Sequence, residues 1–310
     1  MSLRFDLSSF LLVLLTGTSY LTFPVYSAKE STFQQASPVG TTDSALVKEP
    51  WHAKVLVTND DGIDAPGLRA LVRAFSGSIE VVVVAPAINR SGSTSFASIL
   101  SGPVTVETVA VQGAKTAYAV TGYPADCVLI AVTGLMKDDP PDLVVSGINS
   151  GANVADTWAY SGTLGAARIA ALHGIPAIAV SGGGADSLEA IATWVVQLAG
   201  SSFVRDLPSF DYLTVDAPDI PLADIKGVQI VPRARGIIRF GAQLQRTDPD
   251  GSEIWVRAFG GRQSPPSGTD AAAVRNGFIA LTTMQADEQN LPALRQLQER
   301  AAELPLWNAE

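Results

Sequence analysis

The sequence predicts an α/β fold: a Rossmann-like, mainly parallel sheet flanked by helices, with a smaller C-terminal extension that contains β-hairpins. From Lys54 onward, short apolar runs alternate with helical segments, which is the pattern of βαβ units. Each run stops at a turn-forming or polar residue, as buried parallel strands do. We therefore expect residues 54–200 to form the core and residues 201–310 to complete the fold and make oligomer contacts.

Four buried strands are expected in the core, at Val55–Thr58, Val81–Ala85, Leu143–Ser146 and Ala177–Ser181. Helices are expected between them, at Gly67–Phe75, Ala125–Met136 and Gly162–Leu172. Pro124 suits a first helical position, and Gly174 followed by Pro176 suits a helix end. Beyond Gly182, a helix near Leu188–Leu198 precedes shorter strands at Gln229–Val231, Glu253–Val256 and Phe278–Leu281. These strands could form hairpins that extend the sheet or exchange with a partner subunit.

The first 28 residues resemble a signal peptide. Arg4 precedes the apolar run Phe10–Leu15, and small residues follow up to Ser27 and Ala28, where cleavage is expected. Residues 29–53 are rich in Ser, Thr, Gln, Ala and Pro and are expected to be a linker. We expect export to the periplasm or the medium. An uncleaved anchor, a disordered leader and a cytoplasmic location are the alternatives. No later segment is long and apolar enough to span a bilayer.

The composition is that of a globular chain with ample material for a core, and its charge does not favour a nucleic-acid-binding protein. Of the residues, 47% are hydrophobic and 16% charged, with a formal net charge of -9 and no dense Lys/Arg block. This charge argues against binding to nucleic acid or to anionic membranes. It would also repel a phosphorylated substrate, and a bound divalent cation would relieve that repulsion locally.

Several mechanisms are disfavoured by residues that are missing or poorly placed. The single cysteine, Cys127, excludes an intrachain disulfide framework and a multi-thiolate zinc site, and its apolar neighbours predict a core residue. Only two histidines occur, His52 at the linker edge and His173 near a predicted helix end, so a histidine-phosphate mechanism is disfavoured. Neither a Gly-x-x-x-x-Gly-Lys-Ser/Thr loop nor a dinucleotide-binding glycine motif after the first strand is present.

Two adjacent carboxylates, Asp60 and Asp61, follow the first predicted strand. The turn Asn59–Gly62 places them at the carboxyl end of that strand, which faces the ligand crevice of an open α/β sheet. Neighbouring carboxylates repel one another unless a proton or a cation relieves them. Because only oxygen ligands are available, the cation expected is one Mg²⁺ or Mn²⁺ ion.

Comparable polar clusters follow the second and third strands. They are Asn89–Ser93 and Ser146–Asn153, and parallel strands would place them on the same edge as the carboxylates. Taken alone, each cluster is more often a turn than a set of ligands, and it is their occurrence at three strand ends that favours a site. Ser161 precedes the Gly162–Leu172 helix and is a sensible N-cap, while the N–H groups of Gly162 and Thr163 at the helix start could bind phosphate. A metal beside such a helix start is an arrangement for phosphoester hydrolysis.

These motifs, in this order, resemble the SurE survival protein family of metal-dependent 5′-nucleotidases and phosphatases. The resemblance rests on Val55–Gly67, Val84–Pro86 with Asn89–Gly92, Gly122–Val128, Pro141–Asn149 and Tyr160–Thr163, with weaker matches at Gly268–Asp270 and Gly277–Phe278. It implies a Rossmann-like core and a C-terminal extension that builds homodimers or homotetramers through exchanged segments. It also implies metal ligands at Asp60, Asp61, Ser91 and Asn149, and phosphate contacts at Asn89, Asn153, Ser161 and Thr163.

The function expected is divalent-metal-dependent hydrolysis of nucleoside 5′-monophosphates with broad phosphomonoesterase activity. Asp60 or Asp61 would hold the metal and orient the nucleophile, and the residues do not decide which carboxylate acts as a base. A non-catalytic nucleotide- or phosphate-binding protein is one alternative, and a polyphosphatase is another. A small-molecule phosphate monoester is the expected partner in each case except the polyphosphatase.

Overall fold

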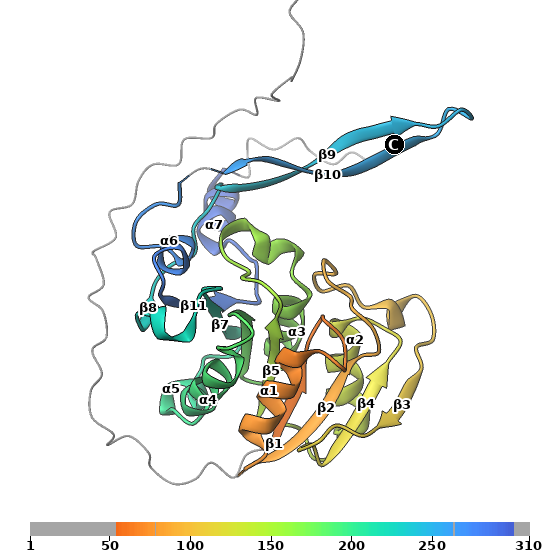
Figure 1. Cartoon of the computed structure of the whole chain (residues 1–310), viewed down its shortest axis with the longest axis vertical. Coiled ribbons are helices and arrows are strands. Elements are labelled where there is room, and N and C mark those ends of the chain that lie inside the picture. The colour runs from red at the N-terminus through yellow and green to blue at the C-terminus, as the bar shows by residue number, and fades with distance from the viewer. Residues whose placement is uncertain (1–53, 78, 263, 301–310) are drawn as a thin grey trace, which may run out of the picture.

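The computed structural model describes residues 54–77, 79–262 and 264–300 (Figure 1). The predicted signal peptide and linker lie outside the described residues. The chain forms one large sheet with helices on both faces, and a long antiparallel hairpin projects from it (Figure 1). This arrangement confirms the predicted α/β class with a hairpin-containing C-terminal part.

The central sheet has nine strands in the order β3-β4-β2-β1-β5-β6-β7-β11-β8. All neighbours pair in parallel except β3 with β4 and β7 with β11. In chain order the strands are β1 Lys54–Thr58, β2 Glu80–Pro86, β3 Val106–Val109, β4 Thr116–Val120, β5 Leu143–Asn149, β6 Ala177–Gly182, β7 Asp211–Ala217, β8 Val228–Ile230 and β11 Ile279–Gln285. All four predicted core strands are present, whereas β3, β4 and β7 were not predicted.

The order of the strands reverses at β1. The chain runs from β1 to β2 and β4 on one side, and then returns to β5 on the other side of β1. In an open sheet, loops that leave in opposite directions at such a point open a crevice at the carboxyl ends of the strands. The loops after β1 and β5 therefore flank a ready-made binding crevice.

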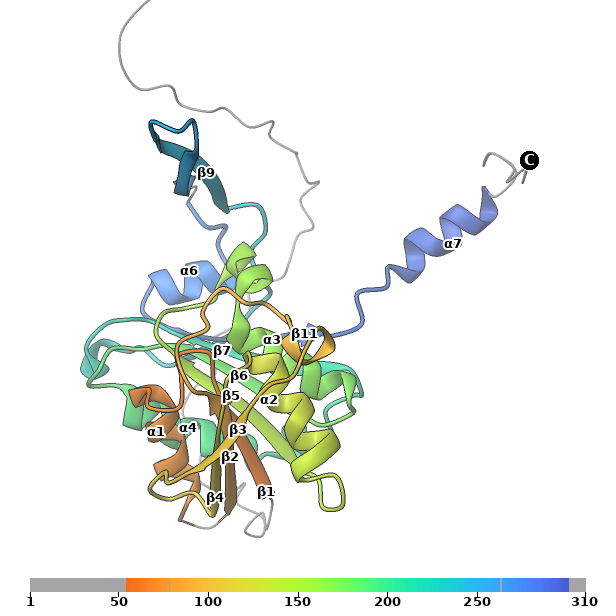
Figure 2. The ribbon, with the colours of Figure 1, turned by 90° about the vertical axis from the view of Figure 1, so that its right-hand side faces the viewer.

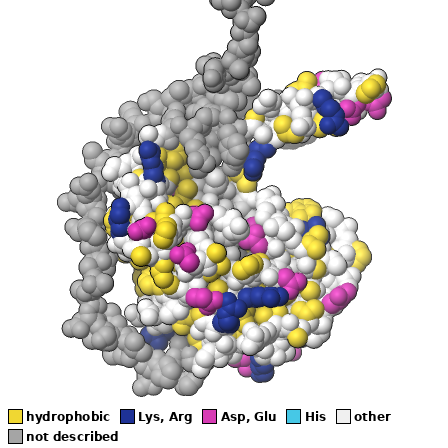
Figure 3. Space-filling model, viewed as in Figure 1, with side chains coloured by type: hydrophobic (Ala, Val, Ile, Leu, Met, Phe, Trp, Pro, Cys, Tyr) yellow, Lys and Arg dark blue, Asp and Glu magenta, His cyan; other side chains and the backbone are white. Residues whose placement is uncertain are grey.

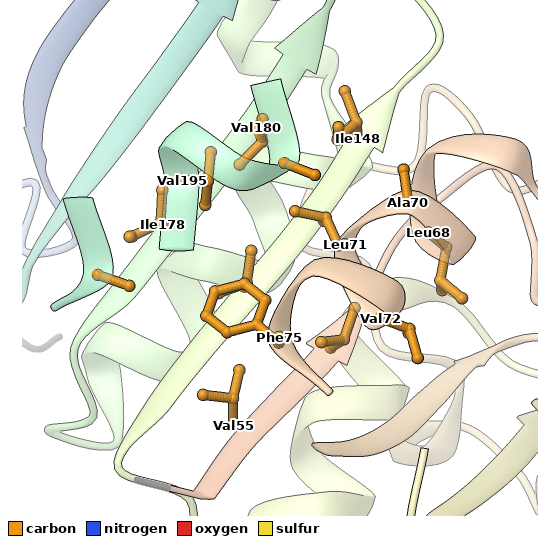
Figure 4. Close-up of a cluster of buried hydrophobic side chains, with 14 of the residues drawn as sticks. Val55, Leu68, Ala70, Leu71, Val72, Phe75, Ile148, Ile178, Val180 and Val195 are labelled. Atoms are coloured by element: carbon orange, nitrogen blue, oxygen red, sulfur yellow. The ribbon is translucent and has the colours of Figure 1, made fainter. Parts of the chain in front are cut away.

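Two layers of helices bury the faces of the sheet. On one face lie α1 (Pro66–Phe75) and α4 (Leu188–Ala199), and on the other lie α2 (Pro124–Ile130) and α3 (Gly162–Leu172). Figure 4 shows Leu71 and Phe75 of α1 in the first of these cores, in one cluster with Ile178 of β6 and Val195 of α4. Each such fully buried side chain contributes about 1.5–3 kcal/mol of transfer free energy. This packing fixes the strand ends that carry the polar clusters.

The predicted helix at Ala125–Met136 is present, but it changes from an α-helix to a π-helix after Ile130. Within this segment, only Pro124–Ile130 (α2) is α-helical. Residues Ala131–Leu135 form a π turn, in which the Met136 N–H donates to the Ala131 carbonyl five residues back, at 2.8 Å. The Thr133 hydroxyl donates to the Leu129 carbonyl at 2.6 Å and so competes for the helical ladder. A hydrophobic pattern does not reveal this change, because a single π turn of five residues is too short to show a period different from that of an α-helix.

The segment after residue 200 contributes to the sheet and also extends away from it. It supplies β7, β8 and β11 to the central sheet, while β9 (Ile238–Thr247) and β10 (Glu253–Arg262) pair with each other. We call this hairpin the arm. The helices of this segment are α5 Ser202–Arg205, α6 Asp270–Arg275 and α7 Leu291–Glu299, and short 3₁₀ turns lie at Ser98–Leu100, Ala155–Tyr160 and Leu222–Asp224. In Figure 2, α7 stands away from the body.

The surface is mixed in character. On the face shown in Figure 3, Lys and Arg side chains stand among Asp and Glu side chains, and the arm carries hydrophobic as well as charged groups. Within the described part of the chain, no helix combines the length and the apolar composition needed to cross a membrane.

Candidate functional site

The turn after β1 presents both carboxylates at the crevice. The Asn59 side chain donates from Nδ2 to the Gly62 carbonyl at 2.8 Å and closes the turn. Gly62 has a φ of 102°, and a Cβ there would lie 3.1 Å from the Ile88 carbonyl carbon. Glycine is therefore required where the β1 turn touches the chain leaving β2. The Asn-Asp-Asp-Gly sequence is thus a turn at the carboxyl end of β1, the edge of the sheet where ligands bind in open α/β folds.

Asp60 is held by helix α3. Its carboxylate is 2% exposed, and Oδ1 accepts a hydrogen bond from the Thr163 hydroxyl at 2.7 Å. Burial raises the pKa of Asp60 above its ordinary value, while the Thr163 hydrogen bond opposes that rise and the Asp61 charge adds to it. A cation beside Asp60 would therefore relieve a carboxylate that folding makes costly to ionise.

Asp61 is held by two other loops. Its Oδ1 accepts from Asn89 Nδ2 at 3.1 Å, and its Oδ2 accepts from the Ser150 N–H at 2.8 Å. Asn89 follows β2 and Ser150 follows β5. The structure therefore brings together the ends of β1, β2 and β5 and the start of α3, as the sequence predicted.

Helix α3 begins directly against Asp60. Ser161 is its N-cap, and Ser161 Oγ accepts from the Leu164 N–H at 3.2 Å. A Cβ on Gly162 would lie 2.6 Å from Ser93 Oγ and 2.9 Å from Asp60 Cβ, and one on Gly165 would lie 1.9 Å from the Thr94 carbonyl oxygen. Only glycine permits this approach, so the positive end of the helix faces the carboxylate pair.

The remaining predicted ligands lie on the same edge. The Ser91 N–H donates to Asn89 Oδ1 at 2.9 Å, which ties Ser91 to the residue that contacts Asp61. Asn149 precedes Ser150, and its Nδ2 donates to the Gly151 carbonyl at 2.7 Å. Ser91 and Asn149 are therefore neighbours of residues that hydrogen-bond Asp61, although neither bonds Asp60 or Asp61 through its own side chain.

The donors at this edge fit a hard cation. Across residues 54–300 as far as the structure describes them, no three His, Cys, Asp or Glu side chains are grouped to hold a metal ion. A cation here would therefore combine the two carboxylates with hydroxyl and amide oxygens, a donor set suited to Mg²⁺ or Mn²⁺. The buried Ser93 hydroxyl, beside Asp60, has no hydrogen-bond partner among the described residues, as expected of a group that faces a ligand.

Asn153 lies in a second cluster. Its N–H donates to Asp216 Oδ1 at 2.6 Å, and its Nδ2 donates to Ser181 Oγ at 2.8 Å, so no hydrogen bond joins it to the carboxylate pair. Burial raises the pKa of Asp216 to about 6, although Arg233 lowers it. Arg233 also pairs with Asp270. The side chains of Asp216 and Arg233 therefore bind the loop that joins β5 to α3.

The sequence reasoning did not identify Ser93, Ser150, Asp216 or Arg233 as site residues. Asp216 shares the signal that revealed Asp60, an acid at the carboxyl end of a parallel strand, but β7 itself was not predicted. Ser93 lies within a cluster that was recognised for other members. Arg233 follows a short strand without any pattern that marks it.

Comparison with known proteins identifies the family. The family model described as "Survival protein SurE" matches residues 55–239. The chain belongs to the SurE family. The matched SurE region runs from β1 into the arm and contains every predicted site residue. Of the second cluster, only Asp270 lies beyond it.

This chain aligns with nearly the whole length of its relatives. A protein named "5'-nucleotidase SurE" from Aeromonas hydrophila is 39% identical over 237 residues, which are 76% of this chain and 92% of that protein. A protein of the same name from Vibrio cholerae serotype O1 is 37% identical over 261 residues, covering 82% and 95%. The crystal structure of SurE from Aquifex aeolicus matches with a TM-score of 0.65 and 31% identity, covering 81% of this chain and 99% of that one.

Proposed function

We propose that this SurE-family chain is a divalent-metal-dependent phosphomonoesterase that hydrolyses nucleoside 5′-monophosphates and accepts other phosphate monoesters. The observation that carries the proposal is the placement of the Asp60–Asp61 pair against the N-terminus of α3, where Gly162 permits close approach. The names of the relatives, 5′-nucleotidase SurE, support the same chemistry.

The phosphate would bind at the helix start. The first N–H groups of a helix have no intrahelical partner, and together with the helix dipole they attract phosphate oxygens. Ser161, Gly162 and Thr163 supply this start, and Asn89 and Asn153 supply amide groups from the loops that flank it. These contacts would stabilise the equatorial phosphoryl oxygens as negative charge develops on them. They also offer local attraction in a chain with a net charge of -9.

Asp60, Asp61, Ser91 and Asn149 would hold one Mg²⁺ or Mn²⁺ ion. When bound, such an ion polarises a phosphoryl oxygen and lowers the pKa of a water molecule. The chain's own contribution is orientation: Thr163 fixes one face of Asp60, while Asn89 and the Ser150 N–H fix Asp61. One of these two carboxylates would then orient the attacking water towards the phosphorus.

Phosphate release from a panel of substrates tests this proposal. The purified protein is assayed with nucleoside 5′- and 3′-monophosphates, an aryl phosphate and polyphosphate, with Mg²⁺, with Mn²⁺ and with a chelator. We expect release from the 5′-nucleotides and the aryl phosphate in the presence of metal, and none with chelator. Undiminished release with chelator contradicts the metal dependence. Nucleotide binding without release indicates a binding protein, and preference for polyphosphate indicates a polyphosphatase.

We also propose that the protein forms homodimers or homotetramers in part through the arm and α7. Three leucines on α7, Leu291, Leu294 and Leu297, are 48%, 44% and 51% exposed, and Trp255 and Leu244 are exposed on the arm. Exposed apolar groups of this size, on elements that project from the body, favour contact with another chain. Light scattering after size-exclusion chromatography measures the mass, and a monomer of 32.4 kDa or less contradicts the proposal.

Finally, we propose export after cleavage near Ser27 or Ala28. The support is the apolar run Phe10–Leu15 behind Arg4, which lies outside the described residues. Amino-terminal sequencing of protein isolated from its host is expected to find a mature start near residue 28, and an intact Met1 contradicts cleavage.

A further inference from the structure

Three charged side chains meet beneath the loop that joins β5 to α3. The Arg233 side chain is 7% exposed; its Nη1 lies 3.3 Å from Asp270 Oδ2 and its Nη2 lies 3.9 Å from Asp216 Oδ2. Asp216 is the penultimate residue of β7, Arg233 follows β8, and Asp270 begins α6. This buried cluster therefore connects the C-terminal part of the chain to the centre of the sheet.

The cluster hydrogen-bonds both the N–H and the carbonyl groups of Asn153 and Ala155. Arg233 Nη1 donates to the carbonyls of Asn153 and Ala155. In return, Asp216 Oδ1 accepts the Asn153 N–H at 2.6 Å, and Asp270 Oδ2 accepts the Ala155 N–H at 2.9 Å. All four polar backbone groups of these two residues are thus bound by the three side chains.

The backbone held in this way is strained. Ala155 has a φ of 50°, in the left-handed region that residues with a Cβ rarely adopt. Such a conformation costs on the order of 1–3 kcal/mol and persists where the surroundings determine it from several directions. Here the surroundings are the side chains of Arg233 and Asp270, which bind the Ala155 carbonyl and N–H.

Stability alone does not account for such a cluster. A buried ion pair contributes little net stability compared with apolar side chains of similar size, whereas it can specify one arrangement of the chain. The arrangement specified here is the start of the turn Ala155–Tyr160, which runs directly into the N-cap Ser161. The cluster thus binds the backbone of Asn153 and the start of the segment that leads to Ser161–Thr163, and both groups of residues are proposed to bind phosphate.

We propose that Arg233 is a positioning residue for phosphate binding, acting through the backbone of residues 153–155 to orient Asn153 and the start of α3. The proposal rests on the proposed function, since it concerns the same phosphate site. Asp216 and Asp270 complete the cluster by neutralising Arg233 and binding the two N–H groups. The C-terminal part of the chain then affects phosphate binding through the backbone of residues 153–155.

The test compares Arg233→Lys with wild type in the full-length protein. Lysine keeps the charge but cannot serve several acceptors in one plane as the guanidinium does. We expect the dissociation constant of inorganic phosphate, measured by calorimetry with Mn²⁺ present, and the KM for a nucleoside 5′-monophosphate to rise roughly 10- to 100-fold, the effect of a displacement near 1 Å. The Mn²⁺ concentration that gives half-maximal activity is expected to stay within about twofold, because Arg233 bonds none of the proposed metal ligands.

Two further variants sharpen the comparison. Lys54→Gln is the control: the Lys54 side chain is also largely buried and pairs with Glu80 at 3.5 Å, at the start of β1 and β2 and away from the carboxyl edge, so a general loss of stability would appear there without a change in phosphate affinity. Thr214→Val removes the hydroxyl that accepts from Arg233 Nη2 at 3.1 Å, and the loss of one hydrogen bond should weaken phosphate binding about threefold.

Each outcome decides the proposal. A folded Arg233→Lys protein with wild-type phosphate affinity overturns it. If Arg233→Lys does not fold, an unchanged affinity in Thr214→Val overturns it instead. If wild type binds phosphate but releases none from nucleotides, the proposed function fails while the calorimetry still tests the role of Arg233. If wild type binds no phosphate, both proposals fail.

Discussion

The carboxyl edge of the sheet buries polar side chains, whereas the projecting periphery, which consists of the arm and α7, exposes apolar ones. At the edge, Asp60 and Thr163 are buried and bonded to each other, and Asp61 is tied to two further loops. In the periphery, α7 exposes Leu291 and Leu297 and the arm exposes Trp255. At the edge, both acids are hydrogen-bonded to residues of the same chain. The periphery exposes apolar surface that another molecule could cover. Substitutions should therefore affect chemistry at the first and association at the second.

The largest difference is expected from Asp61→Asn. Neutralising this carboxylate removes a proposed metal ligand, and metal-ion stabilisation is worth several kcal/mol, so kcat/KM should fall about a thousandfold. Asp64→Asn is the matched control, because Asp64 is an exposed acid three residues away that pairs with Arg69 at 2.6 Å. Wild-type turnover in Asp61→Asn, or an equal loss in Asp64→Asn, would contradict the site. Circular dichroism confirms that both variants fold.

The buried Asp216 predicts how stability changes with pH. Its pKa is raised from 3.8 to about 6 in the folded protein, chiefly by burial, although Arg233 lowers it and Asp270 raises it. Between these two values the folded state binds more protons than the unfolded state, so this group makes stability fall as pH rises from 3.8 to about 6, and adds no further change above that. The contribution is about 3 kcal/mol at 1.36 kcal/mol per pKa unit.

Urea unfolding at pH 4 and pH 6.5 measures this effect. In Asp216→Asn, the decline of the unfolding free energy over this range should be smaller than in wild type by up to the same amount. Asp138→Asn, an exposed acid in the turn that follows the π segment, should leave the decline as it is in wild type. Identical declines in wild type and Asp216→Asn would show that Asp216 does not titrate there.

A methyl group at Gly162 should displace α3 from Asp60 and so lower both stability and activity. The added Cβ would meet Ser93 Oγ at 2.6 Å and Asp60 Cβ at 2.9 Å, so α3 and the carboxylate must move apart at a cost of about 1–3 kcal/mol. We expect a lower thermal midpoint and at least a tenfold loss of kcat/KM in Gly162→Ala, since 1.36 kcal/mol is tenfold. Gly134→Ala is the control, because its Cβ would meet nothing within 4 Å. Equal behaviour of the two variants would mean that α3 does not need its close approach.

The smallest effect on the folded chain is expected in α7. Replacing Leu291, Leu294 and Leu297 with Gln should change the unfolding free energy of the body by less than about 0.5 kcal/mol, as exposed substitutions do. The same variant should shift the oligomer to a smaller mass by light scattering, whereas Gln296→Ala with Gln298→Ala should not. A large loss of stability without a change of mass would show that α7 packs on its own body.

The sequence was most informative where burial is continuous. Strands β1, β2, β5 and β6 pair in parallel and consist of apolar runs that end in or near a polar residue, so they were predicted from sequence. Strand β7, Asp211–Ala217, mixes Asp and Thr with apolar residues although the sheet buries most of it, and this mixture hid it. The arm gives a weak signal because many of its described side chains are exposed.

Some residues of the candidate site could be predicted from the sequence, and others could not. Asp60, Asp61, Asn89 and Thr163 are polar residues at predicted strand ends or at a predicted helix start, and the sheet order brings them together. Arg233 was not predictable from local sequence, because its importance depends on contacts with residues 80 and 78 positions away. Local patterns indicate which residues stand at an edge, but not which distant side chains hold that edge in place.

The reversal of strand order at β1 also sets when the site can exist. Asp61 meets Ser150 at a separation of 89 residues, and Asp60 meets Thr163 at a separation of 103. During synthesis, the carboxylate pair therefore emerges well before Ser150 and Thr163, and only the contact of Asp61 with Asn89, 28 residues away, is available early. Contacts at the two longer separations form late in folding. A chain interrupted before α3 would carry the acids of the site without the helix that makes them useful.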